Sequence, residues 1–132
     1  MNNTRGLNLE LPHPPSINHY YRISGSRLQI SPVGKEYRRM VAVFVAAAGH
    51  PRIDGRLAME IDWHPPDGRE ERDIDNPLKP LLDALQHAGV YPNDKMIDEL
   101  RIHRLEPRFF EKLGIRKRGA VVIYLSKIGE EG

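Results

Sequence analysis

Hydrophobic and polar residues alternate along two stretches of the chain, at 7–11 and 57–64, and this spacing is typical of half-buried β-strands. A nearly unbroken apolar run at 120–126 predicts a last strand, preceded by another at about 97–105. A further short strand is expected at 27–30, just after a Ser-Gly-Ser turn signal. The pattern therefore predicts strands near both ends of the chain and one in its middle.

Apolar residues spaced three and four apart predict two helices, which begin at Ser31-Pro32 and near Pro77. Ser31 is suited to cap the first helix, because its side chain can accept a bond from a free N–H group of the first turn. The apolar stripe of this helix consists of Tyr37, Met40, Val41, Phe44, Val45 and Ala48. The second helix is expected over 77–88, with a face made of Leu78, Leu81, Leu82 and Leu85. Pro80 is expected to remove one helical hydrogen bond if that helix starts at Pro77.

The resulting order of elements is ββαβαββ, which predicts an α/β fold with a mixed β-sheet packed against two main helices. The chain has 132 residues and is expected to form a single domain over residues 1–132. It has no cysteine, which excludes a disulfide framework and thiolate chemistry. No apolar run approaches the ~20 residues of a membrane span, and no signal-peptide pattern opens the sequence. A cytoplasmic protein without membrane contact is therefore expected.

Charge is unevenly distributed along the chain, although the formal net charge is only +2. Between Arg101 and Arg118, seven basic residues stand against two acidic ones, a balance of +5. Acidic residues dominate instead from Glu60 to Asp75. An acidic centre with basic flanks suits a polyanion held around a metal ion. The basic segment is equally compatible with a solvated hairpin loop, and charge alone does not separate the two interpretations.

Asp73 and Asp75 lie two residues apart, so in an extended segment their carboxylates point to the same side, roughly 6–7 Å apart. Such a pair repels unless a cation lies between the groups or one is protonated. Mg²⁺ prefers oxygen ligands, and the pair therefore indicates metal-assisted cleavage of a phosphodiester. Two simpler interpretations stay open: both aspartates are solvated loop residues, or Asp75 or Asn76 caps the next helix. An EF-hand is excluded, because Pro77 and Leu78 stand where it needs an oxygen ligand and a glycine.

Lys79 lies four residues after Asp75 and four before Asp83, so these side chains share one face of a regular helix. They form either a ladder of surface ion pairs or, because Lys79 is in the first turn, a group that stabilises charge on a phosphate. Asp94 can join them only if the chain returns along the helix. That helix is about 18 Å long, and 89–93 can span ~17 Å, so the return is nearly taut. Otherwise Asp94 meets the pair across a dimer interface, or it only starts the next strand.

Other chemistry-bearing residues are less informative. Tyr20 and Tyr21, next to Arg22, are candidates for stacking on bases and binding phosphate, although packing is an equally good role for both rings. The six histidines show no metal-binding spacing, and only His64 is close to the acidic segment in the sequence. Neither a Ser-His-Asp order nor a glycine pattern that binds phosphate or dinucleotides is present, so no nucleotide cofactor is expected.

Spaced motifs extend over most of the chain. The N-terminal motifs are Leu11-Pro12, Pro14-Pro15-Ser16, Asn18, Tyr20-Tyr21-Arg22, Ser31, Gly34 and Tyr37-Arg38. The central motifs are Asp73-Ile74-Asp75-Asn76, Lys79, Asp83-Ala84-Leu85, Gly89 and Asn93-Asp94. In this order they resemble the signature of the RusA family of crossover junction endodeoxyribonucleases, and the similarity runs from about Leu7 to Leu125. Several motifs in the correct order are far more specific than any one of them.

The resemblance implies a RusA-like domain that acts as a homodimeric, Mg²⁺-dependent nuclease, with Mn²⁺ as a substitute ion. Such an enzyme resolves four-way (Holliday) DNA junctions by paired symmetric nicks in recombination and repair, and members commonly derive from prophages. Asp73, Asp75 and Asp94 would be the catalytic, metal-binding carboxylates, and Lys79 the essential lysine. Backbone phosphates would be contacted, mostly without reading sequence, by Arg22, Arg72, Arg101, Arg104, Lys117 and Arg118.

Two positions depart from the family pattern. Glu70 and Glu71 stand where relatives can carry a basic run, which bears on DNA contact beside the site. Asn93 replaces a frequent first aspartate, so Asp94 stands alone there. Two rival functions are a nuclease for flaps or forks, and a non-catalytic protein that binds branched DNA.

Overall fold

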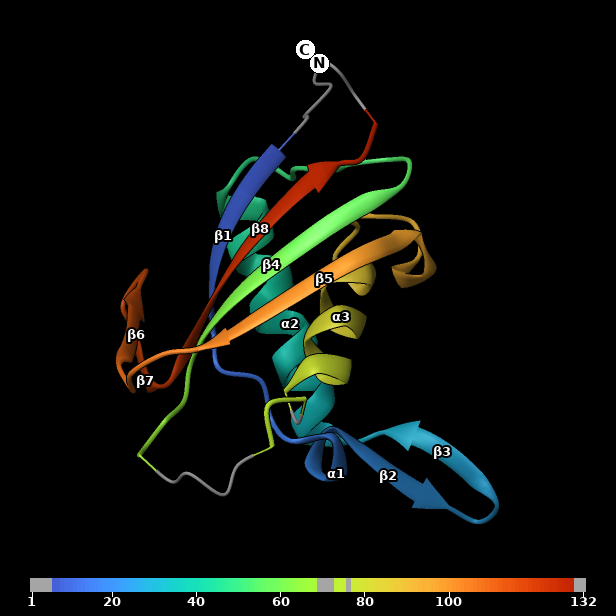
Figure 1. The fold of residues 1–132 in the computed structure, drawn as a ribbon. Helices are drawn as coiled ribbons and strands as arrows, with labels where there is room; N and C mark the ends of the chain where they lie inside the picture. Colours follow the sequence, from blue (N-terminus) through green and yellow to red (C-terminus); the bar gives the residue numbers. More distant parts are fainter. Residues whose placement is uncertain (1–5, 69–72, 76, 130–132) are drawn as a thin grey trace.

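The centre of the molecule is a four-stranded sheet in the order β1-β8-β4-β5 (Figure 1). The computed structural model describes residues 6–68, 73–75 and 77–129. The sheet strands are β1 (Gly6–Pro12), β4 (Leu57–His64), β5 (Ile97–Arg104) and β8 (Ala120–Lys127). β8 pairs antiparallel with β1 and β4, whereas β4 and β5 run parallel. The predicted mixed sheet is confirmed.

Two helices, α2 (Pro32–Ala47) and α3 (Leu78–His87), pack behind the sheet in Figure 1. As predicted, Ser31 caps α2: the backbone N–H of Gly34 donates to its Oγ at 3.0 Å. The condition set for Pro80 is not met, because α3 begins at Leu78 and not at Pro77. Pro80 therefore lies in the first turn, where N–H groups have no partner within the helix anyway. Shorter helical elements are α1 (Ile17–Tyr20) and the 3₁₀ turn η1 (Asp94–Met96).

The core lies between the sheet and the two helices. Side chains of β4 alternate strictly between buried and partly buried positions, and the buried ones are Leu57, Met59, Ile61 and Trp63. The helices contribute Val41, Phe44 and Val45 from α2 and Leu81, Ala84 and Leu85 from α3. Each of these elements buries only one face, which explains why the sequence shows the period of two for strands and of 3.6 for helices. Within the described residues, no helix is long and apolar enough to cross a membrane.

Two β-hairpins stand outside this sheet. One pairs β2 (Tyr21–Ser24) with β3 (Arg27–Ile30), and the other pairs β6 (Phe109–Lys112) with β7 (Ile115–Arg118). The strand expected at 27–30 thus exists but belongs to a hairpin that projects from the body (Figure 1). The basic segment is a hairpin rather than a plain connection. Four-residue strands carry too little periodicity to reveal their pairing.

The carboxyl end of β4 leads through the acidic segment into α3, and α3 leads back to β5. In open sheets, ligands bind outside the carboxyl ends of parallel strands, where the connecting loops gather. Residues 73–75, which the structure describes just before α3, therefore lie at the edge of the sheet where a site is expected. The hairpin β2–β3 lies at the same end of the molecule, below the helices in Figure 1.

Candidate active site

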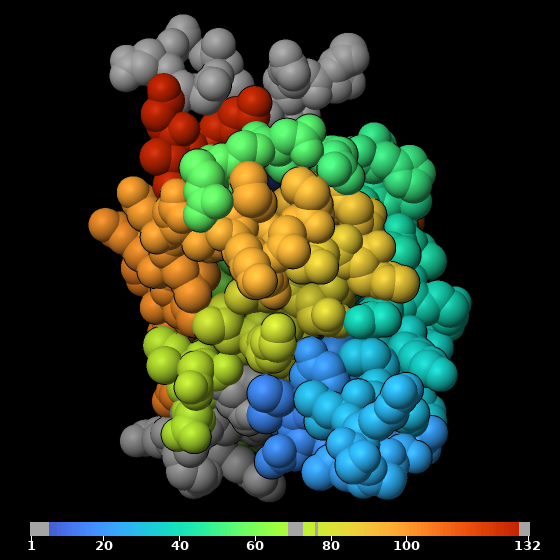
Figure 2. All heavy atoms as spheres, turned by 90° about the vertical axis from the view of Figure 1, so that its right-hand side faces the viewer, coloured from blue at the N-terminus to red at the C-terminus, as the bar shows by residue number. Residues whose placement is uncertain are grey.

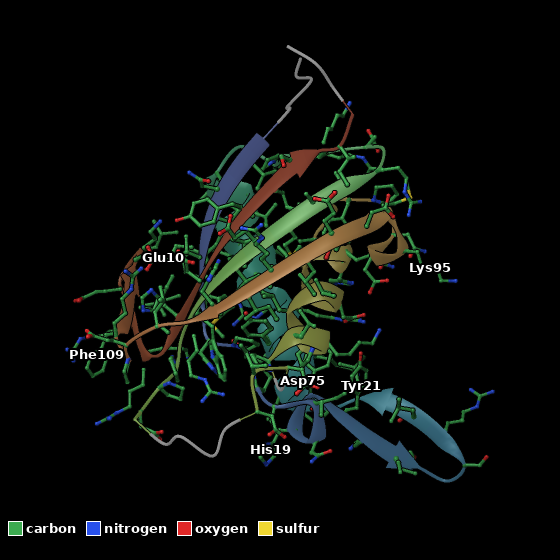
Figure 3. All side chains as sticks on the ribbon, viewed as in Figure 1. Glu10, His19, Tyr21, Asp75, Lys95 and Phe109 are labelled. Carbon is green, nitrogen blue, oxygen red and sulfur yellow. The ribbon has the colours of Figure 1, made fainter. Side chains whose placement is uncertain are left out.

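Asp73 and Asp75 are exposed residues at the N-terminal end of α3, where Figure 3 labels Asp75. The chain turns at Ile74 and Asp75, so the spacing expected from an extended segment does not apply. The carbonyl of Asp75 accepts a bond from the N–H of Leu78 at 3.0 Å, which helps to start the helix. Pro77 occupies the N-cap position, so Asp75 is not the cap. Asn76 lies outside the described residues.

Asp94 returns to the side of α3 and approaches Lys79. Its Oδ2 is 3.8 Å from Nζ of Lys79, and the Asp94 side chain is 24% exposed against 55% for Lys79. Two contacts hold the returning chain: the Asp94 N–H donates to Oε1 of Gln86 at 2.9 Å, and the Tyr91 hydroxyl donates to the carbonyl of Leu82 at 2.8 Å. Asp94 therefore does not start the next strand; it opens η1, and β5 begins at Ile97.

Asp83 joins three helices at the back of this site. Its Oδ2 accepts hydrogen bonds from the Tyr20 hydroxyl and, at 2.9 Å, from Nε of Arg38. Nη2 of Arg38 lies 2.8 Å from the same oxygen. Burial raises the pKa of Tyr20, and its bond to Asp83 raises it further, so this hydroxyl stays a donor. The group formed by Tyr20, Arg38 and Asp83 fixes α1 and α2 against α3.

The metal-binding role expected for Asp73, Asp75 and Asp94 stays a prediction. Among the described residues, which include all three, no three histidine, aspartate or glutamate side chains are placed to hold one ion. The carboxylate oxygens of Asp73, Asp75 and Asp94 suit a hard divalent cation by their chemistry.

Comparison with known proteins decides the family. The family model described as Endodeoxyribonuclease RusA matches residues 12–122. The chain belongs to the RusA family. It is 40% identical to the crossover junction endodeoxyribonuclease of Enterobacteria phage HK97 over 98 residues, which are 71% of this chain and 78% of that protein. It is 34% identical over 127 residues to the RusA enzymes of Escherichia coli O139:H28 and of Enterobacteria phage 82, covering 93% of this chain and 96% of theirs.

RusA membership makes the chain a nuclease, and its basic residues can be placed on the fold with that chemistry in mind. Arg22 is exposed on β2, and Lys117 and Arg118 are exposed on β7. Arg104 lies at the carboxyl end of β5, with its guanidinium 4.9 Å from the centre of the Trp63 ring. Arg101, exposed on β5, pairs in register with Glu60, on the sheet face turned away from the helices. Arg72 lies outside the described residues, as do Glu70 and Glu71.

Sequence reasoning named Tyr20 and Asp83 in this RusA-like chain but missed how they combine. The ring of Tyr20 is fully buried, so it is not available to stack on a base. Asp83 bonds to Tyr20 and Arg38 and does not form the surface ladder with Lys79 that its spacing allows. All three belong to the motifs that carry the family resemblance. Their contacts span 45 and 63 positions, so no local spacing connects them.

Proposed function

We propose that this protein is a Mg²⁺-dependent, structure-specific endonuclease that resolves four-way DNA junctions by paired nicks, in DNA recombination and repair. The observation that carries the proposal is the approach of Asp94 to Lys79 beside the Asp73–Asp75 turn, in a chain of the RusA family. The relatives named above are crossover junction endodeoxyribonucleases. The substrate class follows from that relationship.

Asp73, Asp75 and Asp94 would hold the ion, and Mn²⁺ would substitute for Mg²⁺. When bound, such an ion polarises a phosphodiester and lowers the pKa of a bound water. Lys79 is exposed enough to reach a phosphate, and Asp94 limits where its ammonium can lie. A lysine held in this way offsets negative charge that develops on the phosphate during displacement.

The protein would act as a homodimer. A two-fold dimer presents one site to each of two opposed strands of a junction, which suits paired nicking. Asp94 lies beside Lys79 of its own chain, so we assign Asp94 to the site of its own subunit. Basic residues on β2, β5 and β7 would contact backbone phosphates and position the junction without reading its sequence.

The deciding experiment incubates the purified protein with a labelled synthetic four-way junction, with and without Mg²⁺, and maps nicks on every strand. Symmetric nicks that require the metal are expected. Asp75→Asn is expected to abolish nicking and to retain junction binding in a gel-shift assay. Asp54→Asn is the matched control, because Asp54 is an exposed aspartate paired with Arg52 and far from Asp75 along the chain. Loss of nicking in this control would point to a general effect of removing surface charge.

A second candidate is a protein that binds branched DNA without cutting it. It is favoured by one observation: among the described residues, no three histidine or acidic side chains are placed to hold one ion. A wild type that shifts the junction but nicks it with neither Mg²⁺ nor Mn²⁺ would establish this candidate. A panel of labelled flaps, forks and four-way junctions tests the substrate of the nuclease. Faster cutting of flaps than of four-way junctions would contradict the assignment as a resolvase.

A further inference from the structure

The hairpin β2–β3 exposes an apolar face beside the candidate catalytic lysine. Its register pairs Tyr21 with Ile30 and Ile23 with Leu28, and residues paired in this way lie on the same face of the ribbon. Tyr21 and Ile30 are partly buried where the hairpin joins the body. Ile23 is 77% exposed and Leu28 is 67% exposed. Two adjacent aliphatic side chains on a projecting element indicate a contact with another molecule.

The opposite face of the same hairpin is basic. Arg22 pairs with Gln29, and Ser24 pairs with Arg27, so the register of the strands places both arginines on the face opposite to Ile23 and Leu28. Arg22 also lines the groove beside Ile23 and Leu28. Residues 21–30 include two arginines and no acidic residue. The hairpin is therefore an apolar ribbon with a positively charged back.

A groove connects this apolar face to the candidate site. Its volume is about 680 Å³, and its lining includes Ile17, Tyr21, Ile23, Leu28 and Lys79. Figure 2 looks at the side of the molecule where the hairpin (blue to cyan, lower right) lies below α3 (yellow-green). Ile23, Leu28 and Lys79 thus line the same groove, so a substrate bound by the lysine can also contact the hairpin.

Two partners could bind this face, a second copy of the chain or branched DNA, and the charge around the groove favours DNA. If two copies met through the same groove, Lys79 and Arg22 of both would come together, and the hairpin has no acidic residue to offset them. Branched DNA provides phosphates for the cations. At its branch point it also provides base faces that a continuous duplex keeps stacked. Proteins that deform DNA often insert aliphatic side chains of this kind between base steps.

We propose that β2–β3 is a wedge for branched DNA: Ile23 and Leu28 contact unstacked bases at the branch point, and Arg22 and Arg27 face the neighbouring phosphates. The proposal rests on the proposed function for its substrate. It adds a reason for structural selectivity, because unstacking is least costly where pairing is already interrupted. Binding at the wedge would bring the phosphate next to the branch point to Lys79.

The test uses the full-length double variant Ile23→Thr/Leu28→Thr. Threonine has the β-branched shape that strands favour, and both positions are exposed, so the fold should be preserved. The probe is a four-way junction with 2-aminopurine at the branch point, bound without divalent metal so that it stays intact. Wild type is expected to raise the fluorescence by unstacking the base, and the double variant is expected to bind without this rise. With Mg²⁺, the variant should nick the junction about tenfold more slowly, because the lost contact supports the distortion.

Val43→Thr is the matched control, since it makes the same change at an exposed valine of α2 and should leave every measurement unchanged. The proposal is overturned if the double variant unstacks and nicks like wild type, or if wild type binds without unstacking. Sedimentation of both proteins gives a further check: a variant that becomes monomeric while wild type is dimeric would make the apolar pair a subunit contact instead. A wild type that unstacks the branch point but never nicks would remove the proposed function and leave the wedge in place.

Discussion

At the scale of single residues, Asp83 organises the back of the candidate site. It receives bonds from Tyr20 on α1 and Arg38 on α2, so a carboxylate of α3 fixes both neighbouring helices. Its side chain is 22% exposed and that of Arg38 25%, so both have lost much of their contact with water. Partly buried charges of this kind stabilise a fold only while they remain paired.

Replacing Arg38 with leucine is expected to lower the free energy of unfolding by about 1–3 kcal/mol, because Asp83 loses its charged partner while staying mostly buried. Urea denaturation followed by circular dichroism measures this change. The neighbouring Arg39 provides the control: it is exposed and pairs with Glu36 three residues away, so Arg39→Leu should change stability by about 0–1 kcal/mol. Equal effects of the two substitutions would show that the group around Asp83 has no special role.

Four of the five tyrosines of this protein should ionise at a higher pH than a free tyrosine. Burial raises the pKa of Tyr20, Tyr37 and Tyr91 well above the ordinary value of 10.0, and that of Tyr21 is also raised. A tyrosine whose pKa is raised in the folded state stabilises the fold through its bound proton. This stabilisation is complete below the ordinary pKa, and it is lost as the pH rises through the pKa of the folded state. An ultraviolet titration of phenolate absorbance should therefore show most of the signal appearing only when the protein unfolds in alkali. Titration of all tyrosines near the ordinary value in folded protein would contradict the buried positions.

At the scale of elements, α2 is held against the root of the wedge hairpin by a close contact at Gly34. A Cβ at this position would lie 2.4 Å from the carbonyl oxygen of Tyr20 and 2.7 Å from Cγ2 of Ile30. Ser31 tightens the same region, because its N–H and Oγ both donate to the Tyr20 carbonyl. The start of α2 and the base of β2–β3 are thus one packed unit.

Gly34→Ala is expected to destabilise the protein by about 1–3 kcal/mol, because overpacking against a backbone carbonyl outweighs the ~1 kcal/mol gain in helix propensity. Thermal or urea unfolding measures the change. Gly68→Ala should be neutral, since a Cβ there meets nothing within 4 Å. Stabilisation by Gly34→Ala would show that the contact relaxes without cost.

The hairpin β6–β7 is expected to contribute phosphate contacts. Lys117→Gln combined with Arg118→Gln should weaken junction binding and reduce the slope of log K against log salt by about 1.8, which corresponds to two lost contacts. Gel shifts over a salt series measure the slope. Lys127→Gln is the control, because Lys127 ends β8 at the opposite end of the sheet (Figure 1). An unchanged slope in the double variant would remove Lys117 and Arg118 from the DNA interface.

At the scale of the whole molecule, the assignment of Asp94 to the site of its own subunit can be tested by mixing inactive proteins. Asp75→Asn and Asp94→Asn should each be inactive alone. In a mixed dimer each chain lacks one of the two aspartates, so neither site is complete. Refolding the two variants together should therefore leave the junction uncut, measured on labelled strands. Single nicks made by verified mixed dimers would place Asp94 in the site of the partner subunit.

The sequence alone determined the elements whose burial is regular. Three elements could be predicted because each buries one face, and burial imposes a period of two or 3.6 residues on the sequence. They are the strand at 57–64, the helix capped by Ser31 and the helix with the leucine face. The spaced family motifs also identified the acidic segment, Lys79 and Asp94 as the residues to examine.

Only the tertiary structure decided how those residues meet. Asp94 approaches Lys79 because Tyr91 and Gln86 hold the returning chain against α3, and Asp83 bonds to Tyr20 and Arg38 from distant positions. The sequence also did not predict how the strands of the two short hairpins pair. It therefore did not predict the exposed face formed by Ile23 and Leu28. Contacts between residues far apart in the chain depend on packing of the whole core, and packing leaves no local period to detect.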